Sequence, residues 1–95
     1  MRVVIKKSTN KDKKMMAIFY DEERKIKTSH FGASGYTDYT LSKDEKKKQL
    51  YLDRHRTNEN WNDYMTPGSL SRYVLWNKKT LSASIADYKK KFNLK

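Results

Sequence analysis

The sequence has no cysteine and no long apolar run. Without cysteine there are no disulfides, thiolate nucleophiles or cysteine-based zinc sites, and the composition fits a reducing compartment. No apolar run approaches the ~18 residues that span a membrane, and the first residues lack the apolar core of a signal peptide. We therefore expect an intracellular protein that is not secreted and has no membrane partner.

Acidic residues are also scarce relative to basic ones. Eleven Asp and Glu residues stand against 22 Lys and Arg residues, which gives a net charge of +11 and an isoelectric point near 9.9. Like charges repel one another in a compact chain, and binding to a polyanion relieves this repulsion. The charge balance predicts a nucleic-acid partner. Of the two nucleic acids, DNA is the expected one.

Aliphatic residues are few, and aromatic residues take their place. A hydrophobic content of 36% and a mean hydropathy of -1.08 are typical of disordered chains, but two Trp, seven Tyr and three Phe residues supply large units for burial. We expect Trp61 and Trp76 in the core or at its edge. No repeat or long linker divides the chain, so residues 1–95 are predicted to form one folded domain.

The N-terminal part of the chain has the composition of β-strands. Runs of β-branched, Met and aromatic residues alternate with turn segments rich in Asn, Asp and Glu. The predicted strands comprise residues 2–8, 14–20 and 25–31. They predict a three-stranded antiparallel meander.

The C-terminal part has helical signals. Ser42 and Glu45 have the spacing of a capping box, Thr66 precedes Pro67, and Thr80 precedes apolar residues at helical spacing. The predicted helices comprise residues 43–57, 67–77 and 81–92. We expect an α+β fold with two or three helices packed on one face of the meander.

A glycine-containing segment separates the two parts. Gly32 and Gly35 lack the spacing of phosphate-binding loops, so a turn that needs positive φ explains them, and a backbone contact with phosphate is the alternative. Tyr36 and Tyr39 beside them can stack on nucleic-acid bases or pack on the sheet. These four residues are the candidate loop contacts.

Lysine and arginine side chains are the main candidates for contacts with phosphate. Arg54 and Arg56 also suit the negative end of a helix, so a structural role is open for them. The candidate contacts are Lys6, Lys7, Lys11, Lys13, Lys14, Lys27, Arg54, Arg56, Lys78 and Lys79.

Few residues are suited to catalysis or metal binding. A small nuclease or other hydrolase would use His30, Asp38 and His55, and this is the third functional hypothesis. Asp53 and His55 are two residues apart, which puts them on different faces of a helix. We therefore expect no metal, no cofactor and no catalytic residues.

Several segments together resemble an uncharacterised family of small basic proteins from large double-stranded DNA viruses of algae and protists. The resemblance covers roughly residues 25–92 and rests on His30-Phe-Gly-Ala-x-Gly-Tyr-x-Asp-Tyr-Thr40, Lys43-Asp-Glu45, Tyr51-x-Asp-Arg-His55, Glu59-Asn-Trp61 and Leu70-Ser-Arg-Tyr-Val-Leu-Trp-Asn-Lys78.

The resemblance implies a viral source. The expected function is non-enzymatic, largely sequence-independent binding of viral or host nucleic acid in the host cytoplasm or nucleus. The alternative is a structural or scaffolding protein, packaged in the virion, whose basic surface contacts acidic proteins.

Overall fold

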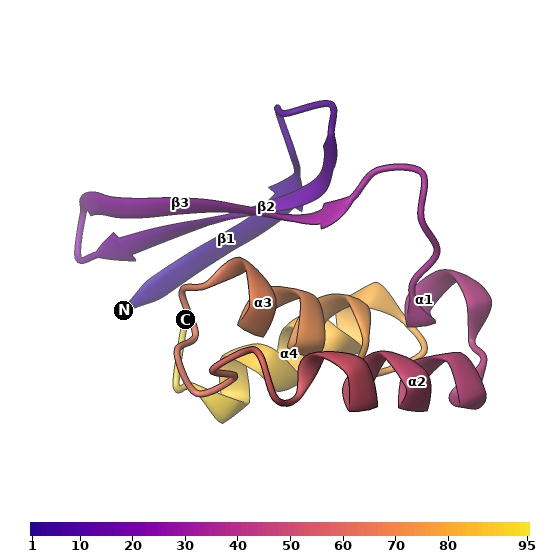
Figure 1. The fold of residues 1–95 in the computed structure, drawn as a ribbon. Helices are drawn as coiled ribbons and strands as arrows, with labels where there is room; N and C mark the ends of the chain where they lie inside the picture. The colour runs from indigo at the N-terminus through magenta and orange to yellow at the C-terminus, as the bar shows by residue number, and fades with distance from the viewer.

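The first third of the chain forms an antiparallel β-sheet. The computed structural model describes all 95 residues, and its strands are β1 (Arg2–Lys7), β2 (Lys13–Asp21) and β3 (Arg24–Ala33), in the order β1-β2-β3 (Figure 1). The predicted meander is confirmed, with strand ends shifted by one or two residues. β2 and β3 start earlier and end later than predicted because their pairing continues from Asp21↔Arg24 to Lys13↔Ala33.

The turn between β1 and β2 is held by its Asn and Asp residues. The Lys13 amide donates to the Asn10 carbonyl at 3.0 Å, and the Asn10 side chain accepts from the Asp12 amide at 2.9 Å. Such side-chain contacts favour a turn over a longer strand. β1 therefore ends at Lys7, and Ser8 already belongs to the turn.

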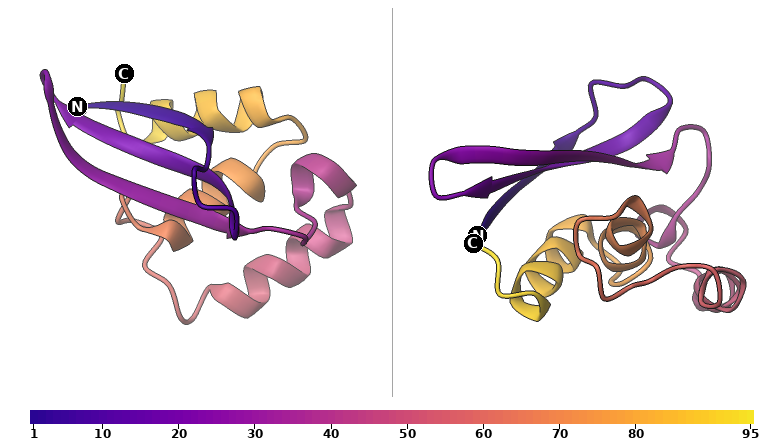
Figure 2. Two further views of the ribbon diagram at one scale, coloured as in Figure 1. Left: turned by 90° about the horizontal axis from the view of Figure 1, so that it is seen from above. Right: turned by 60° about the vertical axis from the view of Figure 1, so that its left-hand side comes forward.

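All helices lie on one side of the sheet. They are α1 (Tyr39–Ser42), α2 (Glu45–His55), α3 (Pro67–Leu70) with the π-helical turn η1 (Ser71–Leu75) directly after it, and α4 (Leu81–Lys91). The side view in Figure 2 shows the two layers, with the sheet above and the helices below. The predicted α+β class is confirmed.

The predicted helix over residues 43–57 is present as the shorter α2 (Glu45–His55), and the short helix α1 (Tyr39–Ser42) before it was not predicted. Ser42 ends α1, and Asp44 caps α2 by accepting from the amides two and three residues further on, at 2.9 and 3.3 Å. Glu45 accepts a hydrogen bond from the Tyr39 hydroxyl instead of reaching back to Ser42. The predicted capping box is therefore wrong, because Asp38 starts a helical turn earlier in the chain.

The helix that starts at Pro67 is shorter than predicted. Thr66 caps it, accepting from the Ser69 amide at 3.2 Å, so its start is confirmed. Its second half widens into the π-helical turn, in which the Trp76 amide donates to the Ser71 carbonyl at 3.0 Å. It ends at Leu75 rather than residue 77. α4 begins after Thr80 as predicted and ends one residue early.

The core lies between the sheet and the helices. β2 contributes Ala17 and Phe19, which are completely buried, and the C-terminal half contributes Tyr88, whose hydroxyl donates to the Tyr64 carbonyl. Burial raises the pKa of Tyr88 well above its usual range, so the hydroxyl stays neutral. The central cluster comprises Val3, Ala17, Phe19, Phe31, Leu70, Val74, Leu75, Tyr88 and Leu94.

Replacing Tyr88 by alanine should destabilise the protein by ~3 to 5 kcal/mol, because a large cavity would open in a small core. Tyr88→Phe keeps the ring and removes only the hydrogen bond to Tyr64, so we expect a destabilisation of about 1 kcal/mol. Urea denaturation measures both values. Equal, small effects for the two variants would show that the ring is not a core element.

Candidate functional site

A pocket of about 480 Å³ lies where one end of the sheet meets the helices. We call it the junction pocket. The sheet and the following loop line it with Lys13, Lys14, Phe31, Gly32, Ala33, Tyr36, Thr37 and Asp38. The helical layer lines it with Tyr51, His55, Glu59, Pro67, Gly68, Ser71, Leu75 and Trp76. Its volume is in the range of small-molecule sites, ~300 to 1,000 Å³.

The segment of residues 32–38, which we call the glycine loop, forms one rim of this pocket. Gly32 and Gly35 have φ of 79° and 86°, in the left-handed region that glycine adopts readily. A Cβ atom on Gly32 would lie 2.6 Å from the Leu75 side chain, whereas one on Gly35 would meet nothing within 4 Å. Gly32 therefore allows the sheet to approach η1 closely. Ser34 fixes the loop by donating to the Asp12 and Lys11 carbonyls at 3.0 and 2.8 Å.

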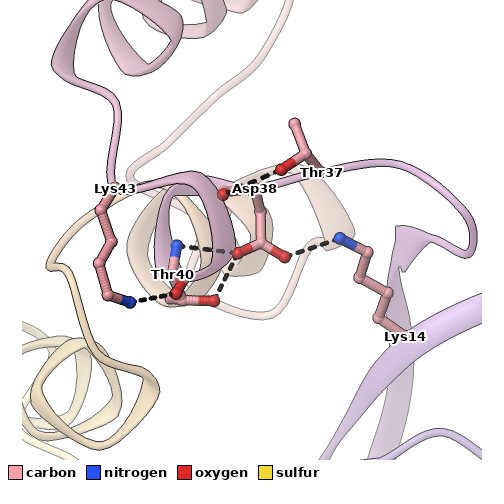
Figure 3. A network of polar contacts seen from close by, with 5 residues as sticks. All are labelled: Lys14, Thr37, Asp38, Thr40 and Lys43. Atoms are coloured by element: carbon pink, nitrogen blue, oxygen red, sulfur yellow. Dashed lines mark hydrogen bonds and ion pairs between the residues drawn. The ribbon is translucent and has the colours of Figure 1, made fainter.

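A buried ion pair connects the sheet to the start of α1 (Figure 3). Lys14 Nζ lies 2.7 Å from Asp38 Oδ2, and the Asp38 side chain is only 3% exposed. The other oxygen, Oδ1, accepts from both the amide and the hydroxyl of Thr40. A buried carboxylate is stable only when its oxygens have partners. Asp38 meets this need with bonds that also cap α1.

Three stacked rings line the helical side of the pocket. The ring of Tyr51 lies 4.2 Å from that of His55, at an angle of 26°, and 4.5 Å from that of Trp76, at 6°. Burial, with the nearby charge of Glu59, raises the pKa of Tyr51 far above its usual range. The Tyr51 hydroxyl therefore stays neutral.

The carboxylate of Glu59 is held by two partners. Oε1 lies 3.1 Å from His55 Nδ1, and Oε2 accepts from Trp61 Nε1 at 2.9 Å. A Cβ atom on Gly68 would lie 2.9 Å from Glu59 Cδ, so glycine leaves room for this side chain. The pair orients the His55 ring and leaves Nε2 as the nitrogen available to a ligand.

The structure brings together five of the candidate cations. They flank the first turn, at the sheet end that carries the glycine loop: Lys6, Lys7, Lys11, Lys13 and Lys14. All of them except Lys14 are exposed.

The other five candidates lie elsewhere. Arg54 and Arg56 flank His55 at the end of α2, and Lys78 and Lys79 follow η1. Lys27 pairs with Phe19, toward the opposite end of the sheet. All five are exposed.

The two candidate tyrosines differ in exposure. Tyr36 is 74% exposed at the pocket, whereas Tyr39 is 2% exposed, bonds to Glu45 and has Lys48 Nζ 4.9 Å from its ring centroid. Base stacking is therefore possible for Tyr36, and Tyr39 has a packing role.

The residues of the hydrolase hypothesis are not all in one place. Asp38 and His55 both line the junction pocket, but His30 instead pairs with the Ser8 hydroxyl through Nδ1, at 2.7 Å. No group of three or more His, Cys, Asp or Glu side chains is arranged to hold a metal ion. The structure therefore does not assemble the three residues into one site.

Sequence reasoning did not find the junction pocket. It singled out the Gly32 to Tyr39 segment and named Asp38 and His55 as candidates for a hydrolase. Glu59, Ser71 and Trp76 reach the pocket only through tertiary packing. The spacing of His55 and Glu59 is the one signal of this site in the sequence. A separation of four residues allows their side chains to pair near the end of a helix.

The family model of DUF5754, described as a family of unknown function, matches residues 3–55, more than half of the chain. The chain belongs to the DUF5754 family. The match includes the sheet, the glycine loop and the first two helices, and it ends at His55 in the pocket wall. Comparison with curated proteins and with solved structures finds no match. None of the helices combines the length and apolar character needed to cross a bilayer.

Alanine at Gly32 should destabilise the protein more than alanine at Gly35. Positive φ costs an L-residue ~1 to 2 kcal/mol at either position, and the contact with Leu75 adds ~1 to 3 kcal/mol of overpacking at Gly32 only. Urea midpoints of Gly32→Ala and Gly35→Ala measure the difference. Equal destabilisation at the two positions would contradict a close approach of the sheet to η1.

Proposed function

We propose that this protein is a non-enzymatic nucleic-acid-binding protein that contacts phosphates largely without regard to base sequence. The resemblance of residues 25–92 to proteins of large DNA viruses makes viral or host DNA the nucleic acid in this proposal. The proposal rests on the positive charge that the fold leaves without an internal partner.

The supporting observation is the small number of ion pairs. Only three are present: Lys14 with Asp38, His55 with Glu59, and Arg56 with Asp53. All lysine and arginine residues except Lys14 and Arg56 therefore lack a carboxylate partner within 4.0 Å. The Arg56–Asp53 pair is exposed and 3.9 Å long, so it neutralises little.

Some of the unpaired cations have a structural role. Lys43, Lys48 and Arg72 donate to carbonyls of the segment that follows η1, at distances of 2.8 to 3.0 Å. Such bonds give partners to carbonyls of the segment between η1 and α4. The exposed candidates have no such contact, so they are the ones that we assign to phosphate binding.

The arrangement of the exposed cations favours a surface around the junction pocket. Lys11 and Lys13 lie beside the glycine loop, and Arg54 lies near the end of the helix that carries His55. Phosphates of a nucleic acid lie several ångströms apart along a strand, so a group of separated cations can contact several at once.

If about five phosphates are neutralised, log K should fall against log salt with a slope near -4.5 on duplex DNA. Affinity would then drop about 500-fold between ~50 and ~200 mM salt. Fluorescence anisotropy with random-sequence duplexes measures this slope. Absence of binding at ~50 mM salt would contradict the proposal and favour acidic proteins as partners.

Four glutamine substitutions should locate the surface. Replacing Lys7, Lys11, Lys13 and Arg54 should flatten the slope by about one unit for each cation that no longer meets a phosphate. Lys14 is left in place because its removal would leave the buried carboxylate of Asp38 without its charged partner.

A matched control removes the same number of charges elsewhere. Arg24, Lys25, Lys90 and Lys95 are exposed and lie outside the pocket lining. Their replacement by glutamine gives the same net charge as the first variant. Equal slopes for the two variants would show that total charge, and not the surface near the pocket, determines binding.

A further inference from the structure

The junction pocket combines aromatic and apolar walls with one unpaired cation, Lys13. Tyr51 and Trp76 stack with their rings nearly parallel, Leu75 and Phe31 add apolar surface, and Tyr36 is exposed at the edge. Tyr51 already stacks on His55 and Trp76, so a base would stack on the ring of Trp76 that ends this stack or on the exposed ring of Tyr36. The pocket therefore suits a ligand with a planar, largely apolar body.

The charges of the pocket favour an anion. Its two carboxylates, Asp38 and Glu59, are each held by two side chains or amides of the protein. Lys13 is exposed at the rim and has no carboxylate partner. A phosphate at the rim would thus meet an unpaired ammonium group and no unpaired carboxylate.

We infer that the junction pocket holds one nucleotide of a single-stranded nucleic acid, with its base beside the Tyr51 and Trp76 rings and its phosphate at Lys13. The inference rests on the proposed function and adds a strand preference to it. The Nε2 atom of His55 supplies a polar contact for the edge of the base, because Nδ1 is already engaged by Glu59.

A single strand is the occupant because a duplex keeps its bases stacked and paired. Entry of a base into a pocket of about 480 Å³ requires that the base leave its stack. This costs a few kcal/mol in a duplex and less in a single strand. Binding should therefore favour the single strand, although a single strand has the lower charge density.

The test is a titration of the protein with an oligothymidylate that carries one 2-aminopurine, alone and as a duplex. We expect the single strand to bind about tenfold or more tightly than the duplex at equal salt, with a change in 2-aminopurine fluorescence. Equal affinities would overturn the inference and leave phosphate binding intact. No binding of either form at low salt would overturn the proposed function as well.

Two substitutions test the position of the base. Ala33→Trp adds a large side chain at an exposed residue of the pocket lining, and Ala86→Trp adds the same side chain on the exposed side of α4. Only Ala33→Trp should remove the preference for the single strand. A preference that survives Ala33→Trp would place the base elsewhere.

A milder variant and a free nucleotide complete the test. Tyr36→Ala removes an exposed ring with little effect on packing and should weaken single-strand binding severalfold while leaving duplex binding unchanged. No effect on either form would count against the pocket. Adenosine monophosphate should compete poorly with the oligonucleotide for the protein. If it competes at the same concentration as the oligonucleotide, the ligand of the pocket is a free nucleotide and not a single strand.

Discussion

The buried carboxylate of Asp38 is the contact on which the arrangement of the two layers depends. Apolar burial holds the sheet against the helices, but it has no preferred direction. Asp38 supplies direction, since one oxygen meets Lys14 of β2 and the other caps α1 at Thr40. α1 is thereby fixed below the end of the sheet, and α2 follows it (Figures 1 and 3). The junction pocket lies beside this contact, since Lys14 and Asp38 both line it.

The protein buries few charges and leaves many exposed. With a net charge of +11 and only three ion pairs, repulsion opposes the compact state, and a small core rich in aromatic residues has to offset it. In the proposed function, phosphates relieve this repulsion. Binding and stability are then linked, because a ligand that binds only the folded state stabilises it.

Local signals in the sequence predicted most of the fold. These signals depend on neighbours along the chain, and the structure confirms each of them. They are the strand composition, the turn at Asn10, the Thr66 and Thr80 caps, and the spacing of the apolar residues in α4. The start of α2 differs from the prediction because Asp44, and not Ser42, caps it. α1 was missed because its cap, Asp38, is held by Lys14, which is 24 residues away in the chain. The pocket was missed for the same reason: the Tyr51–Trp76 stack and the approach of Gly32 to Leu75 join distant segments.

The central claim is that the surface around the junction pocket contacts nucleic acid. The most direct measurement is nuclear magnetic resonance of ¹⁵N-labelled protein during titration with a short single-stranded oligonucleotide. The account predicts the largest shift changes at the backbone amides of residues 32–38 and at the Trp76 indole, with smaller changes at Tyr51 and His55. Changes confined to α4 and the Asp21–Arg24 turn would contradict it.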